Sequence, residues 1–137
     1  MPNEFRFLVI CQGATQRLDD HLVTLTGIVN TLEATAGERS ELAAVVGAVV
    51  HPEWKGKRLD LMAWRLGKKG ERLALPDYAG TPLILPEARG PQVMPYALSV
   101  PIPARGIYGF ELFDPEGLFG RKNELLATYL FFAEVLP

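Results

Sequence analysis

Hydrophobic residues recur at every second position along much of this chain, the pattern of strands with one buried face. The pattern is clearest in residues 107–113, where Tyr108, Phe110 and Leu112 fall on one side and Gly109 and Glu111 on the other. A turn sequence follows at 114–117, and an aromatic run follows at 125–135. The last third of the chain therefore predicts an antiparallel hairpin in which Glu111 points to solvent.

Other segments rich in β-branched and aromatic residues predict strands at 4–12, 21–32, 42–50, 57–66, 71–75 and 94–100. Gly27 interrupts the second of these, and we expect a bulge or a close backbone approach there. Seven of the eleven prolines lie between residues 76 and 103, which is typical of edge or covering segments. Residues 76–93 are expected to be irregular, apart from a short extended piece at 82–86.

About seven to nine short strands, separated by turn signals, predict an all-β fold. The expected architecture is an antiparallel β-sandwich, immunoglobulin-like in style, with residues 1–137 forming a single domain. The alternative is an α+β fold with one helix at 40–50 or 123–132. Ala43 and Ala44 suit a helix, whereas the valines beside them suit a strand covered on both faces.

Cysteine content and hydropathy bear on the compartment. Cys11 is the only cysteine, so an intramolecular disulfide and a cysteine-based zinc site are excluded, and we expect a cytoplasmic protein. The N-terminus lacks the pattern of a secretory signal. The longest apolar run, residues 42–50, is about half of a membrane span, so no membrane partner is expected.

Residues able to support catalysis are few. The chain has two histidines, His21 and His51, and neither Ser40 nor Ser99 lies in a G-x-S-x-G sequence. No H-x-x-x-H or C-x-x-C spacing places two metal ligands on one face, and residues 19–21 are interpreted as a solvated turn. Cys11 is interpreted as a small buried hydrophobic residue. We therefore predict no catalytic residue, metal ligand or cofactor, and a non-enzymatic protein.

An excess of apolar residues favours an interaction module. Residues 42–50 and 125–135 are apolar on both faces, whereas a sandwich buries only one face of each strand. The second face must be covered by the proline-rich segment or by another protein chain, which predicts a protein partner or a homo-oligomer. Adjacent Phe131 and Phe132 must point to opposite faces of a strand. The candidate protein interface consists of Met62, Trp64, Tyr129, Phe131 and Phe132.

A basic segment supports a second hypothesis, binding of a nucleic acid or another polyanion. Residues 55–72 carry seven basic and two acidic side chains, a net charge of +5, whereas the rest of the chain carries −7. The overall pI of 5.7 argues against this function, and the charges are also those expected of a soluble edge strand. The candidate patch is Trp54, Lys55, Lys57, Arg58, Arg65, Lys68, Lys69 and Arg72.

A third hypothesis is a small-ligand pocket beneath the proline-rich segment 76–95, involving His51, Asp77 or Tyr78. Such a pocket could also hold an enzyme site. No motif in the sequence specifies its ligand.

Two short segments resemble a family of small, uncharacterised bacterial β-sandwich proteins, a domain of unknown function. One is a strand ending in Cys11, followed by the strand at 22–29; the other is Gly106-Ile107-Tyr108, before the final hairpin. In that family acidic residues follow the cysteine, whereas Gln12 and Gly13 follow it here. The resemblance implies a β-sandwich and assigns no catalytic residue.

Overall fold

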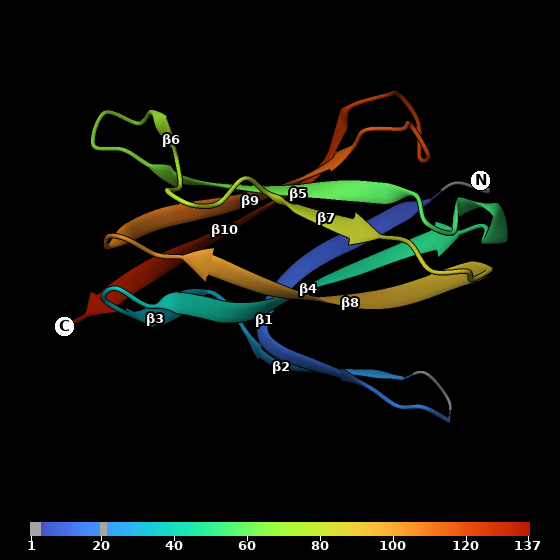
Figure 1. The fold of residues 1–137 in the computed structure, drawn as a ribbon, viewed down its shortest axis with the longest axis horizontal. Helices are drawn as coiled ribbons and strands as arrows, with labels where there is room; N and C mark the ends of the chain where they lie inside the picture. The colour runs from blue at the N-terminus through green and yellow to red at the C-terminus, as the bar shows by residue number, and fades with distance from the viewer. Residues whose placement is uncertain (1–3, 20–21) are drawn as a thin grey trace.

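The structure is a computed structural model that describes residues 4–19 and 22–137, in which ten β-strands and one short 3-10 helix form (Figure 1). The elements are β1 (Phe5–Gln16), β2 (Val23–Ile28), β3 (Thr31–Thr35), β4 (Arg39–Val50), η1 (Pro52–Trp54), β5 (Arg58–Leu66), β6 (Arg72–Ala74), β7 (Thr81–Ile84), β8 (Gly90–Pro101), β9 (Gly106–Asp114) and β10 (Glu124–Leu136). No helix among the described residues is long and apolar enough to cross a membrane.

The strands form two sheets packed as a sandwich, which confirms the predicted fold class. One sheet has four strands in the order β2-β1-β4-β8, and the other has six, β3-β10-β9-β5-β6 with β7 also paired to β5. The pairs are antiparallel except β3 and β10, which run parallel. The α+β alternative is wrong, because segments 40–50 and 123–132 lie almost entirely in β4 and β10.

The hydrophobic core lies between the two sheets. The hairpin predicted for the last third of the chain is confirmed. β9 and β10 pair antiparallel, and Tyr108, Phe110 and Leu112 are all almost fully buried. From the other sheet, Ala44 and Val46 of β4 belong to the same buried cluster. Alternation along β9 therefore directs its large side chains into the sandwich.

The run 21–32, predicted as one strand, is instead divided between the two sheets. β2 ends at Ile28 in the four-stranded sheet, and β3 begins at Thr31 beside β10 in the six-stranded sheet. Val29 donates its N–H to Ile10 of the first sheet, and Asn30 accepts a hydrogen bond from Phe132 of the second. Two consecutive residues thus carry the chain across, which gives ten strands instead of seven to nine.

The proline-rich segment is more regular than expected, because it contains β7 and the start of β8. Its predicted edge character is confirmed, since β8 is the last strand of the four-stranded sheet. Pro91, Pro95 and Pro101 are the second, sixth and twelfth residues of β8, so all three lie at the same phase of the two-residue repeat relative to β4. Prolines at this phase leave the free edge of β8 short of N–H donors, which discourages pairing with another sheet.

Candidate interaction surfaces

Uncharged side chains cover the outer face of the four-stranded sheet, which points away from the six-stranded sheet. Three rows cross β1, β4 and β8 in register. The rows are Phe7, Gly47 and Val93; Val9, Val45 and Pro95; and Cys11, Ala43 and Ala97. We call these residues the apolar face. At one margin, Arg39 and Glu41 are joined through hydrogen bonds to Ser99, so charge begins only at the end of the rows.

Gly47 has no side chain, which allows the ring of Phe7 to lie directly on the backbone of β4. A Cβ added at Gly47 would lie 2.1 Å from Cε2 of Phe7, closer than any real side chain allows. The ring therefore covers the backbone of β4 and leaves Phe7 partly exposed.

A hairpin made by the end of β1 and by β2 crosses the apolar face, and we call it the arm (residues 12–19 and 22–28). β1 pairs with β4 only as far as Cys11 and pairs with β2 from Cys11 to Gln16. In Figure 1 this hairpin turns back beneath β4 and β8. Leu25 of the arm packs on Cys11, Ala43 and Val45, and Cys11 and Val45 are fully buried as a result.

Two neighbouring cavities make a cleft between the arm and the apolar face. The larger, 470 Å³, is lined by Gln16 of the arm and by Val93 and Pro95 of β8. The smaller, 360 Å³, lies nearer the base of the arm and also includes Pro95. Its further lining residues include Gln12, Gly13, Ala14, Ala43 and Ala97. The cleft thus combines apolar strand surface with amide groups and with the charged residues Glu41, Glu87 and Arg89.

The ionisable groups around the cleft are poor candidates for chemistry. Burial raises the pKa of Tyr96 to about 12, and its hydroxyl donates a 2.9 Å hydrogen bond to the carbonyl of Ile84. Burial also raises the pKa of the Cys11 thiol, which disfavours the nucleophilic thiolate. Ala43, Val93, Pro95 and Ala97 give the cleft apolar surface on which an apolar group can bind.

The outer face of the six-stranded sheet carries Trp64, which the chain itself covers. Trp64 lies over Gly109, where an added Cβ would be 2.4 Å from the indole ring. The Arg72 guanidinium is centred 4.5 Å from that ring and makes a 2.7 Å ion pair with Glu111. Glu111 is on the outer face as expected, but Arg72 and its neighbours bury it instead of leaving it in solvent.

Phe132 is covered in the same way at the other side of this sheet. Arg105 lies 5.4 Å from the centre of the Phe132 ring, and its Nε is 2.7 Å from Glu134. Each large ring on the six-stranded outer face therefore has an arginine over it and a carboxylate that neutralises the arginine.

The candidate interface predicted from the sequence is divided between two sides of this sheet. Met62, Trp64 and Phe132 lie on the outer face, whereas Tyr129 and Phe131 point into the sandwich. Phe131 stacks on Tyr108 and Phe110, and the Tyr129 hydroxyl donates a 2.7 Å hydrogen bond to Val29. The interpretation of Phe131 and Tyr129 as interface residues is wrong, because core packing occupies both.

The basic patch is also divided. Lys57 and Arg58 lie at the start of β5, while Lys68 and Lys69 occupy the turn after its end, about 30 Å of strand further on. Trp54 is buried against His51 and Phe119 and cannot stack on a base. Acidic partners neutralise much of the patch, since Lys55 pairs with Glu87, Lys57 with Glu116, Arg58 with Asp60, and Arg72 with Glu111. Arg65, the remaining residue of the patch, lies in β5 and pairs with Tyr108 of β9.

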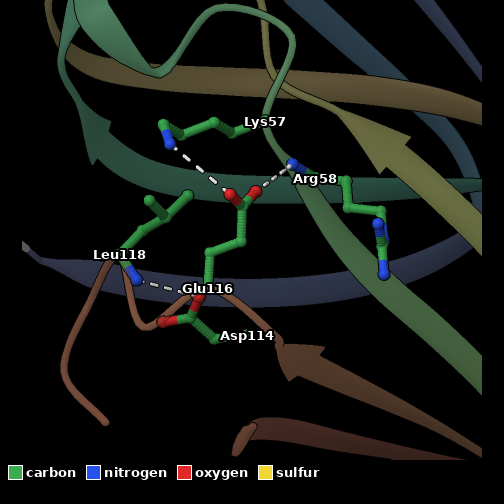
Figure 2. Close-up of polar contacts among 5 residues, drawn as sticks. All are labelled: Lys57, Arg58, Asp114, Glu116 and Leu118. Atoms are coloured by element: carbon green, nitrogen blue, oxygen red, sulfur yellow. Dashed lines mark hydrogen bonds and ion pairs between the residues drawn. The ribbon is translucent and has the colours of Figure 1, made fainter. Parts of the chain in front are cut away.

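Figure 2 shows how the β9–β10 loop is attached to the start of β5. Glu116 accepts a 3.2 Å hydrogen bond from the backbone N–H of Arg58 and lies 3.4 Å from Lys57 Nζ. The hydrogen bond from the backbone N–H of Arg58 lowers the pKa of Glu116 below its usual range, and the positive charge of Lys57 adds a smaller lowering effect. Asp114, at the base of the same loop, accepts a 3.0 Å hydrogen bond from the N–H of Leu118. These acids have structural roles.

Glu116→Gln is expected to remove part of the acid sensitivity of folding. Because the pKa of Glu116 is lowered on folding, its contribution is complete above its unfolded pKa of 4.5 and is lost as the pH falls through the lower folded value. The stability difference between wild type and variant should therefore shrink below about pH 4.5. Urea unfolding between about pH 3 and 7 measures it, and a difference that stays constant across this range would contradict the assignment.

Asp77 and Tyr78 are neighbours in the chain, but the structure does not bring His51 to them: His51 follows the end of β4, whereas the Asp77 carbonyl accepts a hydrogen bond from Arg39 at the start of β4. His51 contacts Trp54, whereas the Tyr78 hydroxyl bonds Thr81 and the carbonyl of Leu61. The cavity in the proline-rich segment is lined instead by residues between Ile84 and Tyr96. His21 and Asp20 lie outside the described residues, among which no group of three His, Cys, Asp or Glu side chains could hold a metal.

The sequence did not reveal the arm or the cleft. Only Ala43, Val45 and their neighbours in β4 stood out, as an apolar run with two buried faces. A similar signal was present in β1, where Phe7, Leu8, Val9, Ile10 and Cys11 are consecutive apolar residues. Two adjacent strands that are apolar on both faces indicate an outer surface that something covers.

Comparison with known proteins assigns no family to this chain. No protein-family model and no curated protein sequence matches it. The resemblance to uncharacterised bacterial β-sandwich proteins thus stays a prediction. The crystal structure of an immunoglobulin-like protein from Pseudomonas aeruginosa, at 1.50 Å resolution, is similar to this chain over 91% of each, with 16% sequence identity and a TM-score of 0.42.

Proposed function

We propose that this protein is a non-enzymatic interaction module of the cytoplasm that binds a second copy of itself through the apolar face. The contrast between the two outer faces carries the proposal. Arg72 and Arg105 cover the rings on the six-stranded sheet, although Met62, Ile107 and Leu130 remain exposed there. On the apolar face, Phe7 and Val93 are 37% and 40% exposed and lie in one row that has no charged member. Covering exposed apolar surface is favourable by about 25 cal/mol per Å², so the apolar face gains from a partner.

A second copy suits this surface because the rows of the apolar face contain no charged residue. Phe7 and Val93 stay exposed beside the arm, and two such rows can pack side chain against side chain without burying a charge. A two-fold pair is also the commonest symmetry of homo-oligomers and uses the same patch on both copies. The arginine-capped face would have to displace two ion pairs to pack in this way.

Val93→Glu is expected to convert a dimer into a monomer, because the new carboxylate lies within the apolar face and would be buried without a partner. The dissociation constant should rise at least about tenfold. Leu130→Glu is the matched control, since Leu130 is similarly exposed on the six-stranded outer face. Sedimentation equilibrium at micromolar concentrations measures both, after circular dichroism has shown that each variant is folded.

Two results would overturn the proposal. One is a wild-type protein that is monomeric up to about 1 mM, because a dissociation constant above 1 mM means a free energy of association weaker than about −4 kcal/mol. The other is equal weakening by Val93→Glu and Leu130→Glu, which would place the contact elsewhere.

A further inference from the structure

We infer that the two copies exchange the ends of their arms while each arm stays on its own apolar face, so that Leu18 of each copy enters the cleft of the other. This inference rests on the proposed self-association and names the segment that fills the site. The occupant is thus part of this same chain, presented by its partner copy.

The arm supplies an apolar group with no cover of its own. Leu18 is 96% exposed, and Leu22, across the same hairpin, is 58% exposed. The hairpin is closed by a 2.9 Å hydrogen bond from the N–H of Arg17 to the carbonyl of Leu22, which holds the two leucines near each other. Two neighbouring exposed leucines gain about 25 cal/mol per Å² of apolar surface that a partner covers.

The cleft has the complementary chemistry. Val93 and Pro95 line the 470 Å³ cavity with apolar surface, together with Ile84, Pro86 and Met94. Gln16 also lines it and lies only two residues before Leu18, so the end of the arm and the opening of the cavity are on the same side of the molecule. Figure 1 shows the arm extending toward the end of the sandwich where β8 begins. A two-fold axis near this opening places each Leu18 at the cavity of the other copy.

Charges around the two parts also complement each other. The arm carries Arg17 and Asp19, which form a 3.4 Å ion pair. The cavity is lined by Glu87, which pairs with Lys55 at 3.4 Å, and by Arg89, whose guanidinium has no hydrogen-bond or ion-pair partner in residues 4–19 and 22–137. Reciprocal insertion brings an anion and a cation of the arm to a cation and an anion of the cleft, which fixes the register of the pair.

Site-specific disulfide formation tests the exchange. One population of the full chain carries Leu18→Cys and a second, with a tag of different mass, carries Val93→Cys; the two are mixed and mildly oxidised. A mixed disulfide can then form only between copies, and we expect it to be the main product on a non-reducing gel. The matched control replaces Val93→Cys by Leu130→Cys, on the other outer face, and should give at least fivefold less product. Native Cys11 does not compete, because it is fully buried.

Leu18→Glu, measured by sedimentation equilibrium, completes the test. Arm exchange predicts at least a tenfold rise in the dissociation constant, as for Val93→Glu, whereas Leu136→Glu, exposed at the far end of β10, should leave it unchanged. Equal disulfide yields from Val93→Cys and Leu130→Cys would overturn the exchange. If Val93→Glu still breaks the dimer in that case, self-association through the apolar face stands without the arm. A monomeric wild type would overturn both.

Discussion

Replacing Phe131 by alanine is expected to lower the free energy of unfolding by about 4 kcal/mol. Phe131 is 4% exposed, and its ring lies between those of Tyr108 and Phe110 at centroid distances of 5.7 and 5.9 Å. Removing it deletes buried apolar surface and two stacked aromatic contacts and leaves a cavity between the sheets. The melting temperature should fall by roughly 10–15 °C.

The neighbouring Phe132→Ala is the matched control, because it removes the same atoms from the opposite face of β10. Phe132 is partly exposed and contacts the Arg105 guanidinium, so we expect a loss of about 1 kcal/mol or less. Urea unfolding followed by circular dichroism gives both values from the shift in midpoint, provided that the slope is unchanged. Equal losses, or a larger loss for Phe132, would mean that the outward ring has been assigned incorrectly.

Asp114→Ala is expected to destabilise the protein by about 3 kcal/mol, although it removes only a small polar side chain. The Asp114 carboxylate is fully buried at the end of β9 and accepts the N–H groups of Leu118 and Phe119 at 3.0 and 2.9 Å. Both amides lose a charged acceptor in the variant, and the loop that they hold carries Phe119 against Trp54. The loss should therefore include part of this aromatic contact.

Asp60→Ala tests whether the effect depends on burial. Asp60 also carries a carboxylate near this end of the sandwich, but it forms a partly exposed ion pair with Arg58 and should contribute less than about 1 kcal/mol. Thermal unfolding of the two variants provides the comparison, and fluorescence of Trp54 should shift to longer wavelength only in Asp114→Ala. If Asp114→Ala unfolds at the wild-type temperature, the loop amides find other acceptors and Asp114 has no structural role.

Several local predictions are confirmed because they depend on neighbours in sequence. Alternation places Tyr108, Phe110 and Leu112 on one face of β9 whatever lies above them, since successive side chains of any strand point to opposite sides. The turn at residues 114–117 similarly favours a hairpin. The proline content between residues 76 and 103 indicates strands with a free edge because proline lacks the N–H that a central strand needs.

Predictions that required knowledge of a distant partner were less successful. Glu111 was expected in solvent, and it is buried because Arg72, 39 residues away, folds over it. Phe131 and Phe132 are equivalent in a two-residue repeat, and only the position of β9 relative to the core distinguishes them. The passage from β2 to β3 at residues 29 and 30 left no break in the hydrophobic pattern, because both sheets bury apolar side chains.

Local sequence patterns are sufficient to predict the β class, the last hairpin, the inward face of β9 and the need to cover a second face of β4. These depend on backbone geometry and on the cost of exposing apolar surface, which act on each segment locally. Three features could be seen only in the folded chain: the arginines over the rings of one outer face, the β1–β2 arm across the apolar face, and the cleft beneath that arm. Each of these depends on contacts between segments far apart in the chain, such as Arg72 with Glu111 and Leu25 with Val45. A sequence pattern contains no information on which distant segments are in contact, and the candidate site is formed by such contacts.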